Sequence, residues 1–361
     1  MPRPSKESST RKRPSKAALD AARDPLRIVA IGGGTGLSTL LRGLKDYVHQ
    51  PWYDSGKRFS PAVDVTAVVT VTDDGGSSGR LRRDFAVLPP GDIRNCMVAL
   101  SEDEALLAKL FQHRFSAGRG LKGHSFGNLF LTALTDVTGD FSKAVQFSSE
   151  VLAILGRIYP STAANVGLQA RLVDGEVVTG ETRISKTRSG IDRVKLNPPR
   201  CRPLPQTLEA IEAADLVCLG PGSLYTSVIP NLLVSGIPSA IERSQALKAY
   251  FVNLMWQPGE TMGYSAFDHV RAIRKHARRE LLDCVVVNTR PISGLLRRRY
   301  AAQKVLPVDN DITRIEDQGL KVVGADLLGQ SDKIRHDSTA LAEVAVRLAR
   351  EGREARRNDR R

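Results

Sequence analysis

The sequence predicts an α/β fold: a parallel sheet with helices on both faces, together with a helical segment and a small β insert. Several short apolar runs are each followed by a glycine-containing polar loop and a helical pattern, which is typical of parallel strands buried on both faces. A mostly helical region extends from about residue 92 to 156. From about 167 to 200, an Asp-Gly turn joins two short runs, as in a β-hairpin.

The first predicted strand leads into the most distinctive loop. An apolar strand over residues 28–31 is followed by the glycine-rich turn 32–36 and by a helix that begins near Leu37. Another molecule can approach so bare a backbone closely, and the amides at a helix start favour phosphate. The dinucleotide pattern G-x-G-x-x-G fails because its third glycine would fall on Leu37, and no P-loop Gly-Lys-Ser/Thr follows. A tight turn without a ligand is the alternative.

Three later strands end in similar loops. Apolar runs at 63–72, 215–219 and 250–254 lead into polar loops at 73–80, 220–227 and 253–261. Further strands are expected at 284–287 and 322–328, and the last helix near residue 337. The carboxyl ends of parallel strands lie at one edge of a sheet, so these loops can converge on one cleft. We expect a binding site there rather than plain connections.

Within this cleft, the residue types suit a ligand that contains phosphate. The expected contacts are loop amides and an arginine, namely Gly33, Gly34, Thr35, Gly36, Gly222, Ser223 and Arg80 or Arg94.

Polar side chains near the cleft have two interpretations. Asp73 and Asp74 suit ribose hydroxyls or Mg²⁺ held through water, and an Asx turn is the alternative. Because neighbouring side chains at a strand end diverge, we expect one of the two to face the ligand. His124 and Asn128, one helical turn apart, are expected either to contact substrate or to cap and pack a helix.

The chain of 361 residues has a formal net charge of +14, but the location of this charge weakens the case for a nucleic-acid or membrane partner. Residues 1–24 and residues 347–361 each hold seven Lys/Arg against three acidic residues, so the ends supply +8 and the body +6. We therefore expect disordered basic tails at 1–24 and 347–361 and a single domain at 25–346, with the β insert at about 167–200. Scattered cysteines, no signal-peptide core and no membrane span indicate a cytoplasmic protein.

Four ordered motifs resemble those of the bacterial gluconeogenesis factor family, the YvcK-like proteins, in the superfamily of the 2-phospho-L-lactate transferase CofD. They are IGGGTGLS at 31–38, TDDGGSSGRLR at 72–82, PPGDIRN at 89–95 and LGPGSLYTS at 219–227. KIRHD at 333–337 resembles the C-terminal motif of the family. The resemblance covers roughly residues 26–348 and leaves out the tails.

The resemblance implies a Rossmann-like parallel sheet with an inserted region. It also implies a regulator that binds UDP-N-acetylglucosamine or UDP-glucose and supports cell shape and peptidoglycan precursor supply during growth on gluconeogenic carbon sources. It also implies phosphorylation by a Ser/Thr kinase at Ser338 or Thr339. We further expect a homodimer and no specific nucleic-acid partner. The residues expected to bind the UDP-sugar are Gly33, Gly34, Thr35, Gly36, Ser38, Asp73, Asp74, Gly76, Ser77, Ser78, Arg80, Asp92, Arg94, Asn95, His124, Asn128, Gly220, Pro221, Gly222, Ser223, Ser227, Asn253, Thr261 and Arg335.

Two other functions remain open. In the transferase branch of the superfamily, aspartates at the position of Asp73 and Asp74 serve Mg²⁺ and substrate. A Mg²⁺-dependent transferase that moves a phospholactyl or phosphoenolpyruvyl group from a nucleotide carrier is therefore the main alternative, and catalysis by the regulatory branch is not implied. An NAD-dependent oxidoreductase is disfavoured by the broken dinucleotide pattern.

Overall fold

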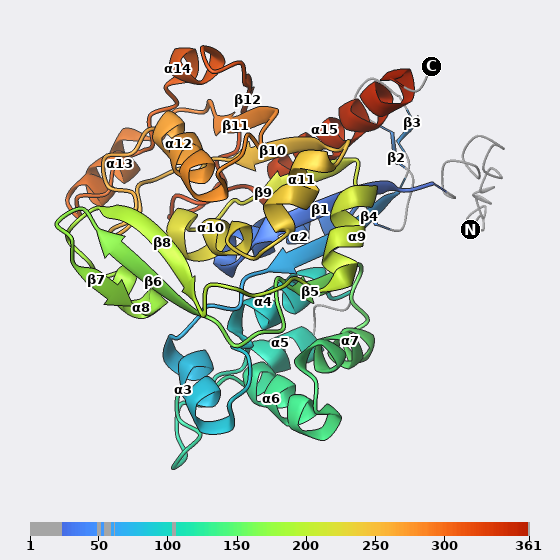
Figure 1. The fold of residues 1–361 in the computed structure, drawn as a ribbon, viewed down its shortest axis with the longest axis vertical. Helices are drawn as coiled ribbons and strands as arrows, with labels where there is room; N and C mark the ends of the chain where they lie inside the picture. Colours follow the sequence, from blue (N-terminus) through green and yellow to red (C-terminus); the bar gives the residue numbers. More distant parts are fainter. Residues whose placement is uncertain (1–23, 49–51, 54–58, 61, 103–105, 360–361) are drawn as a thin grey trace, which may run out of the picture.

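A seven-stranded sheet forms the centre of the protein (Figure 1). Its strand order is β12-β11-β10-β9-β1-β4-β5, and all neighbouring pairs are parallel. The computed structural model describes residues 24–48, 52–53, 59–60, 62–102 and 106–359. The strands of this sheet are β1 (Leu26–Gly32), β4 (Val63–Val69), β5 (Arg157–Pro160), β9 (Leu216–Leu219), β10 (Leu247–Phe251), β11 (Cys284–Asn288) and β12 (Lys321–Ala325).

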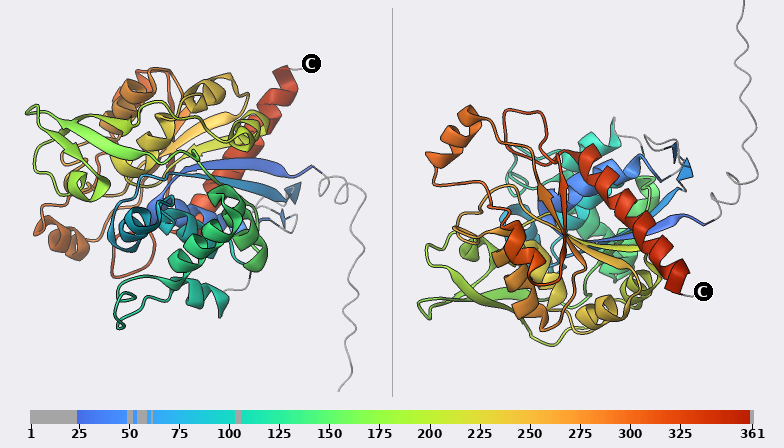
Figure 2. Two further views of the ribbon diagram at one scale, coloured as in Figure 1. Left: turned by 60° about the horizontal axis from the view of Figure 1, so that its bottom comes forward. Right: turned by 90° about the horizontal axis from the view of Figure 1, so that it is seen from above.

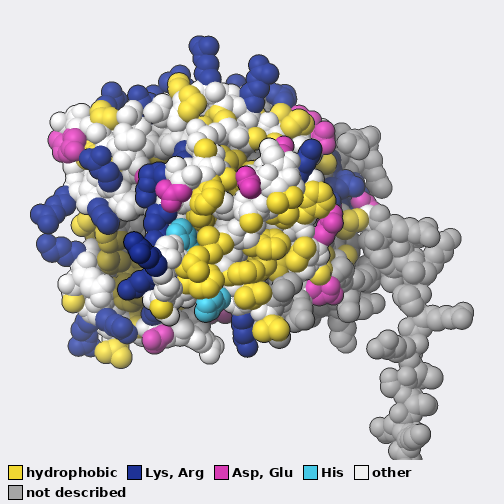
Figure 3. All heavy atoms as spheres, turned by 90° about the horizontal axis from the view of Figure 1, so that it is seen from below, with side chains coloured by type: hydrophobic (Ala, Val, Ile, Leu, Met, Phe, Trp, Pro, Cys, Tyr) yellow, Lys and Arg dark blue, Asp and Glu magenta, His cyan; other side chains and the backbone are white. Residues whose placement is uncertain are grey.

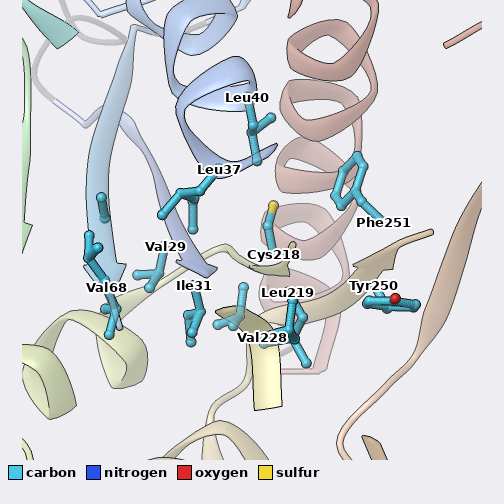
Figure 4. Packing of buried hydrophobic residues seen from close by; sticks show 14 of the residues in the cluster. Val29, Ile31, Leu37, Leu40, Val68, Cys218, Leu219, Val228, Tyr250 and Phe251 are labelled. Atoms are coloured by element: carbon cyan, nitrogen blue, oxygen red, sulfur yellow. The ribbon is translucent and has the colours of Figure 1, made fainter. Parts of the chain in front are cut away.

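The central strands are buried on both faces. In β9, Cys218 and its neighbour Leu219 point to opposite sides of the sheet, as do Tyr250 and Phe251 in β10 (Figure 4). All four side chains are fully buried. A strand covered on both faces needs apolar residues at successive positions, which is why continuous apolar runs located these strands in the sequence.

Helices form a layer on each face of the sheet (Figure 2). On one face α2 (Gly34–Lys45) packs against α15 (Ser338–Asp359), which also contacts β1, β9 and β10. On the other face α9 and α10 contact β1. Besides α15, the described helices of the second half of the chain are α9 (Pro205–Ala213), the π-helical turn η1 (Leu224–Val228), α10 (Ile229–Leu232), α11 (Ile237–Arg243), α12 (Ala266–Ala277), α13 (Gly294–Ala301) and α14 (Ile312–Glu316).

The helical segment and the β insert predicted from the sequence are both present, so the predicted fold class is confirmed. The helical segment lies below the sheet in Figure 1 and contains α3 (Gly76–Phe85), α4 (Gly91–Leu100), α5 (Leu107–Gln112), α6 (Phe126–Thr138) and α7 (Phe141–Val151). The insert is an antiparallel sheet of order β7-β6-β8, with β6 (Gly167–Leu172), β7 (Val177–Thr179), α8 (Glu181–Ile184) and β8 (Ile191–Asn197). A further two-stranded hairpin pairs β2 (Trp52–Tyr53) with β3 (Phe59–Ser60).

The C-terminal end is helical, which shows that the prediction of a disordered tail from residue 347 was wrong over 347–359. α15 continues to Asp359, and its buried positions include Ala349. Arg353 is 6% exposed and donates from Nη2 to the Asp215 carboxylate at 2.5 Å, while Arg356 pairs with the other carboxylate oxygen. The arginine-rich composition resembled a solvated tail, but two of these arginines neutralise a buried carboxylate beside β9.

The predicted N-terminal tail lies outside the described residues except for its last residue, Asp24. The carbonyl of Asp24 accepts a hydrogen bond from Arg353 Nη1 at 2.7 Å. The chain just before β1 is therefore attached to α15.

Candidate functional site

The loops after β1 and β9 touch at the carboxyl edge of the sheet. The strand order reverses here, because the chain passes from β1 to β4 on one side and later returns to β9 on the other. A Cβ added to Gly36 would collide with the carbonyl of Pro221, and one added to Gly222 would lie 3.3 Å from the carbonyl oxygen of Gly33. Glycine at these positions lets the two backbones approach each other closely. The two loops thus converge as the sequence predicts.

The first turn of α2 faces a carboxylate. Gly34 begins the helix with φ of +61°, and the interaction of its backbone N–H with the carboxylate of Asp92 in α4 lowers the pKa of that carboxylate. A Cβ added to Gly33 would lie 2.6 Å from Asp92 Oδ2. The same side of the turn is close to Ser227, whose hydroxyl is 3.7 Å from the Cβ position of Gly34. An anionic group, here a carboxylate, is therefore accommodated at the glycine turn.

The adjacent Asp73 and Asp74 have different partners. Asp74 Oδ1 accepts hydrogen bonds from the backbone N–H and the hydroxyl of Thr182, both at 2.8 Å, and so attaches the β4 loop to the β insert. Asp73 Oδ1 accepts from the N–H of Gly75 at 2.8 Å in an Asx turn. The Asp73 carboxylate also interacts with Asp92. Asp73 is thus the member of the pair that faces the other acidic side chains.

Three carboxyl groups, those of Asp73, Asp92 and Glu181, influence one another in this cleft. Burial and then the charge of Asp73 raise the pKa of Asp92 to about 7, while the Gly34 N–H and the charge of Arg94 oppose this shift. Burial and then the charges of Asp92 and Asp73 raise the pKa of Glu181 well above its usual value. Glu181 comes from α8 in the β insert, and no sequence motif marked it. Folding brings these like charges together despite their repulsion.

Buried polar side chains hold the loop after β9 in place through hydrogen bonds. Glu260 is 5% exposed and accepts from the N–H of Tyr225 and the hydroxyl of Thr226, both at 3.1 Å. Burial raises the pKa of Glu260 to about 7, and these hydrogen bonds partly oppose the shift. Asn231 donates to the carbonyl of Ser227 at 2.7 Å. Sequence reasoning missed Glu260 and Asn231, because a single polar residue in a loop or short helix matches no motif.

The N-termini of α3 and α6 meet through paired polar side chains. Ser77 Oγ lies 2.9 Å from His124 Nδ1, and Asn128 Nδ2 donates to Ser78 Oγ at 3.4 Å. Burial and then the charge of Arg80 lower the pKa of His124, which favours the neutral ring. Asn128 Oδ1 is buried and has no hydrogen-bond partner within the described part of the chain. In this structure the side chains of these predicted site residues join the N-terminus of α3 to that of α6.

Both predicted arginines contact the region that precedes α6. Arg94 donates to Ser125 Oγ and to Asn95 Oδ1, both at 2.6 Å. Arg80 donates to the carbonyl of Lys122 at 3.0 Å. Burial and then the charge of Arg114 lower the pKa of Arg94, and the cleft carboxylates oppose this. Arg94 is therefore the arginine that balances charge within the cleft.

The fourth predicted loop (253–261) is connected to the third (220–227) through a chain of side-chain amides. Asn253 Oδ1 accepts from the N–H of Gly222 at 3.2 Å, and Asn253 Nδ2 donates to Gln257 Oε1 at 3.1 Å. Gln257 Nε2 then donates to Ser223 Oγ at 2.7 Å. Thr261 is fully buried and accepts from the N–H of Gln257 at 3.0 Å, so its hydroxyl supports this loop rather than facing the cleft.

The hydroxyl of Ser38 also faces inward. The side chain is 5% exposed and donates to the carbonyls of Gly34 and Thr35 in its own helix at 3.2 and 3.1 Å. The remaining glycines give the loops their shape, since Gly76 and Gly220 have φ of +46° and +73°. Positive φ values of this kind favour glycine.

A cavity of about 520 Å³ opens beside the amide chain, between the ends of β10 and β11. Its size suits a small-molecule ligand. Of its lining residues, Asn253 alone was predicted from the sequence, and the others include amides, two arginines and an indole from Asn288, Asn310, Arg290, Arg297 and Trp256. They follow separate strands and loops, so sequence spacing does not relate them.

The C-terminal motif reaches the same end of β10. His336 Nε2 lies 3.2 Å from the carbonyl oxygen of Val252, and Ile334 packs against Leu254. Val252 and Leu254 both line the cavity. Arg335, between the two anchored residues, is exposed. The predicted arginine therefore lies on a segment that borders the cavity.

The described residues contain no group of three or more His, Cys, Asp or Glu side chains arranged to hold a metal ion. Asp74 Oδ1 accepts two hydrogen bonds from Thr182, and metal binding by the two adjacent aspartates stays a prediction. In the same part of the chain, no single helix is long and apolar enough to cross a bilayer. One bent pair, Leu224–Leu232 with Ile237–Arg243, meets that test by length and composition alone.

Comparison with known proteins gives a consistent result. The family profile of the 2-phospho-L-lactate transferase CofD matches residues 28–328. The gluconeogenesis factor of Bacillus subtilis is 46% identical over 326 residues, which is 90% of this chain and 98% of that protein. The gluconeogenesis factor of Halalkalibacterium halodurans is 46% identical over 320 residues, covering 88% of this chain and 95% of that protein.

Two solved structures show the same architecture. Crystal structures of a Bacillus halodurans protein superpose with TM-scores of 0.84 and 0.83 at 44% identity, and each covers 90% of this chain. The alignments cover 100% and 99% of those chains. The chain therefore belongs to the CofD family, in its YvcK-like gluconeogenesis factor branch.

Proposed function

We propose that this protein is a cytoplasmic regulator that binds UDP-N-acetylglucosamine or UDP-glucose at the carboxyl edge of its sheet. Its role would be that of a gluconeogenesis factor, required for cell shape during growth on gluconeogenic carbon sources. The observation that carries the binding proposal is the contact between the glycine-rich loops after β1 and β9 where the strand order reverses. The names of its relatives support the physiological role.

The diphosphate would bind at the start of α2. The N–H of Gly34 already interacts with one anionic group, the carboxylate of Asp92, so a phosphate oxygen at this N–H would replace an interaction of the same kind. A charged Asp92 repels a diphosphate, and a protonated one does not. Because the pKa of Asp92 is about 7, protonation of this side chain is accessible when the ligand arrives.

The cavity beside β10 and β11 supplies groups for the uracil and sugar. Its amides, from Asn253, Asn288 and Asn310, both donate and accept hydrogen bonds, as uracil and sugar hydroxyls require. Trp256 offers an aromatic surface in the same cavity. Exposed Arg335 borders it and is free to approach an anionic ligand from its rim.

The transferase alternative is supported by the acidic cleft. The carboxyl groups of Asp73, Asp92 and Glu181 influence one another in that cleft, and because these described side chains are not arranged to bind a cation directly, they would hold Mg²⁺ through water. In that function the cation would supply positive charge to the phosphates of a nucleotide carrier. The residues present supply oxygen ligands, and Asp74 would have to release Thr182 to join them.

Isothermal titration calorimetry with UDP-N-acetylglucosamine tests the proposal. We expect micromolar binding that needs no Mg²⁺ and yields no product. UDP-glucose, UMP and GDP, each with and without Mg²⁺, serve as comparisons. Failure to bind either UDP-sugar would overturn the regulator proposal. Tight guanine-nucleotide binding with Mg²⁺-dependent transfer to a deazaflavin would establish the transferase alternative.

The further partners implied for the family remain predictions. Ser338 is the first residue of α15, and Thr339 is exposed beside it, so a Ser/Thr kinase can reach at least the Thr339 hydroxyl. Mass spectrometry of the protein after reaction with a Ser/Thr kinase checks this point. The expected homodimer also remains a prediction, and analytical ultracentrifugation of the full chain checks it.

A further inference from the structure

The middle of the helical segment carries a large share of the positive charge. Residues 106–135 contain four cations, Lys109, Arg114, Arg119 and Lys122, and no Asp or Glu. The body of the chain, residues 25–346, has a net charge of +6, and this stretch alone contributes +4. All four cations are exposed. An anionic partner is therefore attracted to this part of the body as well as to the chain ends.

The loop that follows α5 carries three of these cations away from the body of the protein. The backbone N–H groups of Gly123 and Phe126 donate to the carbonyls of Phe115 and His113, both at 2.8 Å, and close the base of the loop. Its tip, residues 116–122, lies beyond these bonds and projects from the helical segment at the bottom of the view (Figure 1). The tip can therefore reach an external surface before the rest of the segment does.

The cations of this region differ in whether other groups engage them. Arg80 and Arg114 donate to backbone carbonyls of the loop at 3.0 and 2.5 Å, and so hold it in place. The side chains of Lys109, Arg119 and Lys122 form no hydrogen bond or ion pair with other described residues. Their charges are therefore available to a partner outside the chain.

Large apolar side chains are exposed among the same cations. Leu106, Leu110 and Leu121 are 78%, 39% and 44% exposed, and the last two directly follow or precede a lysine. On the side of the molecule that the helical segment forms, hydrophobic side chains make up a broad patch, and Lys and Arg side chains gather on its left (Figure 3). Exposed apolar groups of this kind mark an interaction surface. We refer to residues 106–124, which comprise α5 and the loop after it, as the α5 loop surface.

The combination of cations and leucines favours a lipid bilayer over a nucleic acid. At a bilayer surface, lipid phosphates attract Lys and Arg, while the boundary of the acyl chains accepts aliphatic side chains. A nucleic acid also attracts cations, but its bases stack on aromatic side chains, and leucine has no such face. Acidic residues return with Asp136 and Asp140 at the far end of α6, so the cationic contact is confined to the α5 loop surface.

We propose that the α5 loop surface docks the protein on an anionic lipid bilayer. Leu110 and Leu121 enter the boundary between headgroups and acyl chains, and Lys109, Arg119 and Lys122 contact lipid phosphates. The contact is peripheral, because a short helix and a loop do not cross a bilayer. None of these five residues is among those proposed to bind the UDP-sugar, so docking does not depend on that ligand.

Co-sedimentation of the full chain with lipid vesicles tests the proposal. We expect binding to vesicles that contain about 30% phosphatidylglycerol and much weaker binding to pure phosphatidylcholine. R119Q/K122Q should weaken binding about 25-fold, since each cation near an anionic surface contributes roughly fivefold. The matched control R200Q/R202Q removes two exposed cations between β8 and α9 and should weaken binding far less.

The leucines distinguish a bilayer from other polyanions. L110S/L121S leaves the charge unchanged and should still weaken vesicle binding at least about tenfold, because less apolar surface leaves water. The control V173S/V177S alters two exposed valines of the β insert and should have no such effect. Single-stranded RNA and polyglutamate serve as comparison polyanions. Binding of either one at the α5 loop surface without binding to the vesicles would overturn the lipid proposal.

A fluorophore separates this surface from the basic residues 1–24, which also attract anionic lipids. Ala117 is exposed at the loop tip, and the four native cysteines are buried. An environment-sensitive dye on A117C should emit at shorter wavelength on the vesicles, whereas the same dye on V173C should not. Circular dichroism checks that the variants are folded. Absent vesicle binding, bound protein without the A117C shift, equal losses in the two arginine-containing variants, or full affinity of L110S/L121S would each overturn the proposal.

Discussion

Acidic side chains lie at both ends of the strands of the sheet, and their surroundings differ: Asp215 is buried, whereas Asp73 and Asp92 are half-buried. Where β9 begins, Asp215 is 1% exposed and is neutralised by Arg353 and Arg356. Where the strands end, Asp73 and Asp92 face each other, with Arg94 as the cation that acts on Asp92 within the described residues. A neutralised buried charge fastens two elements together, whereas like charges held together oppose folding and are typical of sites that act on ligands.

The largest effect should come from breaking the neutralised cluster. D215A leaves Arg353, which is 6% exposed, without its main partner. We expect the free energy of unfolding to fall by about 3–5 kcal/mol, as measured by urea denaturation. The matched control is R357A. Arg357 lies on the same helix as Arg353 and forms an exposed ion pair with Asp24, so its loss should lower the free energy of unfolding by less than about 1 kcal/mol. Similar losses from both variants would contradict the structural role given to Asp215.

The next effect should come from filling the acidic cleft. G34V places a branched side chain at a position with φ of +61°, where its Cβ would lie 3.7 Å from the hydroxyl of Ser227. We expect UDP-N-acetylglucosamine binding to weaken at least about 100-fold because the side chain blocks phosphate from the N–H of residue 34. Calorimetry measures the affinity. Unchanged affinity in a folded variant would rule out the glycine turn as the phosphate site.

The pH dependence of the free energy of unfolding should distinguish the acidic cleft from the neutralised cluster at Asp215. The pKa of Asp92 is raised to about 7 in the folded protein, above its unfolded value near 4. The folded state then binds more protons between these values, so this group lowers stability as pH rises from about 4 to 7. D92N should remove this slope and raise the free energy of unfolding at pH 8 by at least about 1 kcal/mol. Urea denaturation at pH 5 to 8 provides the measurement, and parallel slopes for the two proteins would refute the assignment.

The smallest effect should separate the two adjacent aspartates. D73N alters the acidic cleft and should change ligand affinity by about tenfold, the size of one charge-assisted contact. D74N weakens the hydrogen bonds to Thr182 and should mainly lower stability, by about 1 kcal/mol. Calorimetry and urea denaturation on both variants distinguish these outcomes. A larger affinity change for D74N than for D73N would reverse the assignment.

The candidate site was partly predictable because part of it is local. The glycine turn 32–36 and the loop 220–227 follow strands directly, and strand ends of a parallel sheet share one edge. Glu181 was not predictable in this way, because it enters the cleft from the β insert. The insert is attached to the cleft by the hydrogen bond between Thr182 and Asp74, which are 108 residues apart in the sequence. Ser38 and Thr261 were expected to contact ligand, but their hydroxyls face backbone groups inside the protein.

The sequence by itself determined the strands, the loops that end them and the fold class, because apolar periodicity and glycine content act over a few neighbouring residues. The tertiary structure decided which charges meet. Arg353 and Asp215 are 138 residues apart, and composition around Arg353 resembles a solvated tail until β9 supplies its partner. Whether a charged side chain stabilises a helix, borders a site or remains in water depends on groups that only folding brings into contact, so local patterns do not decide it.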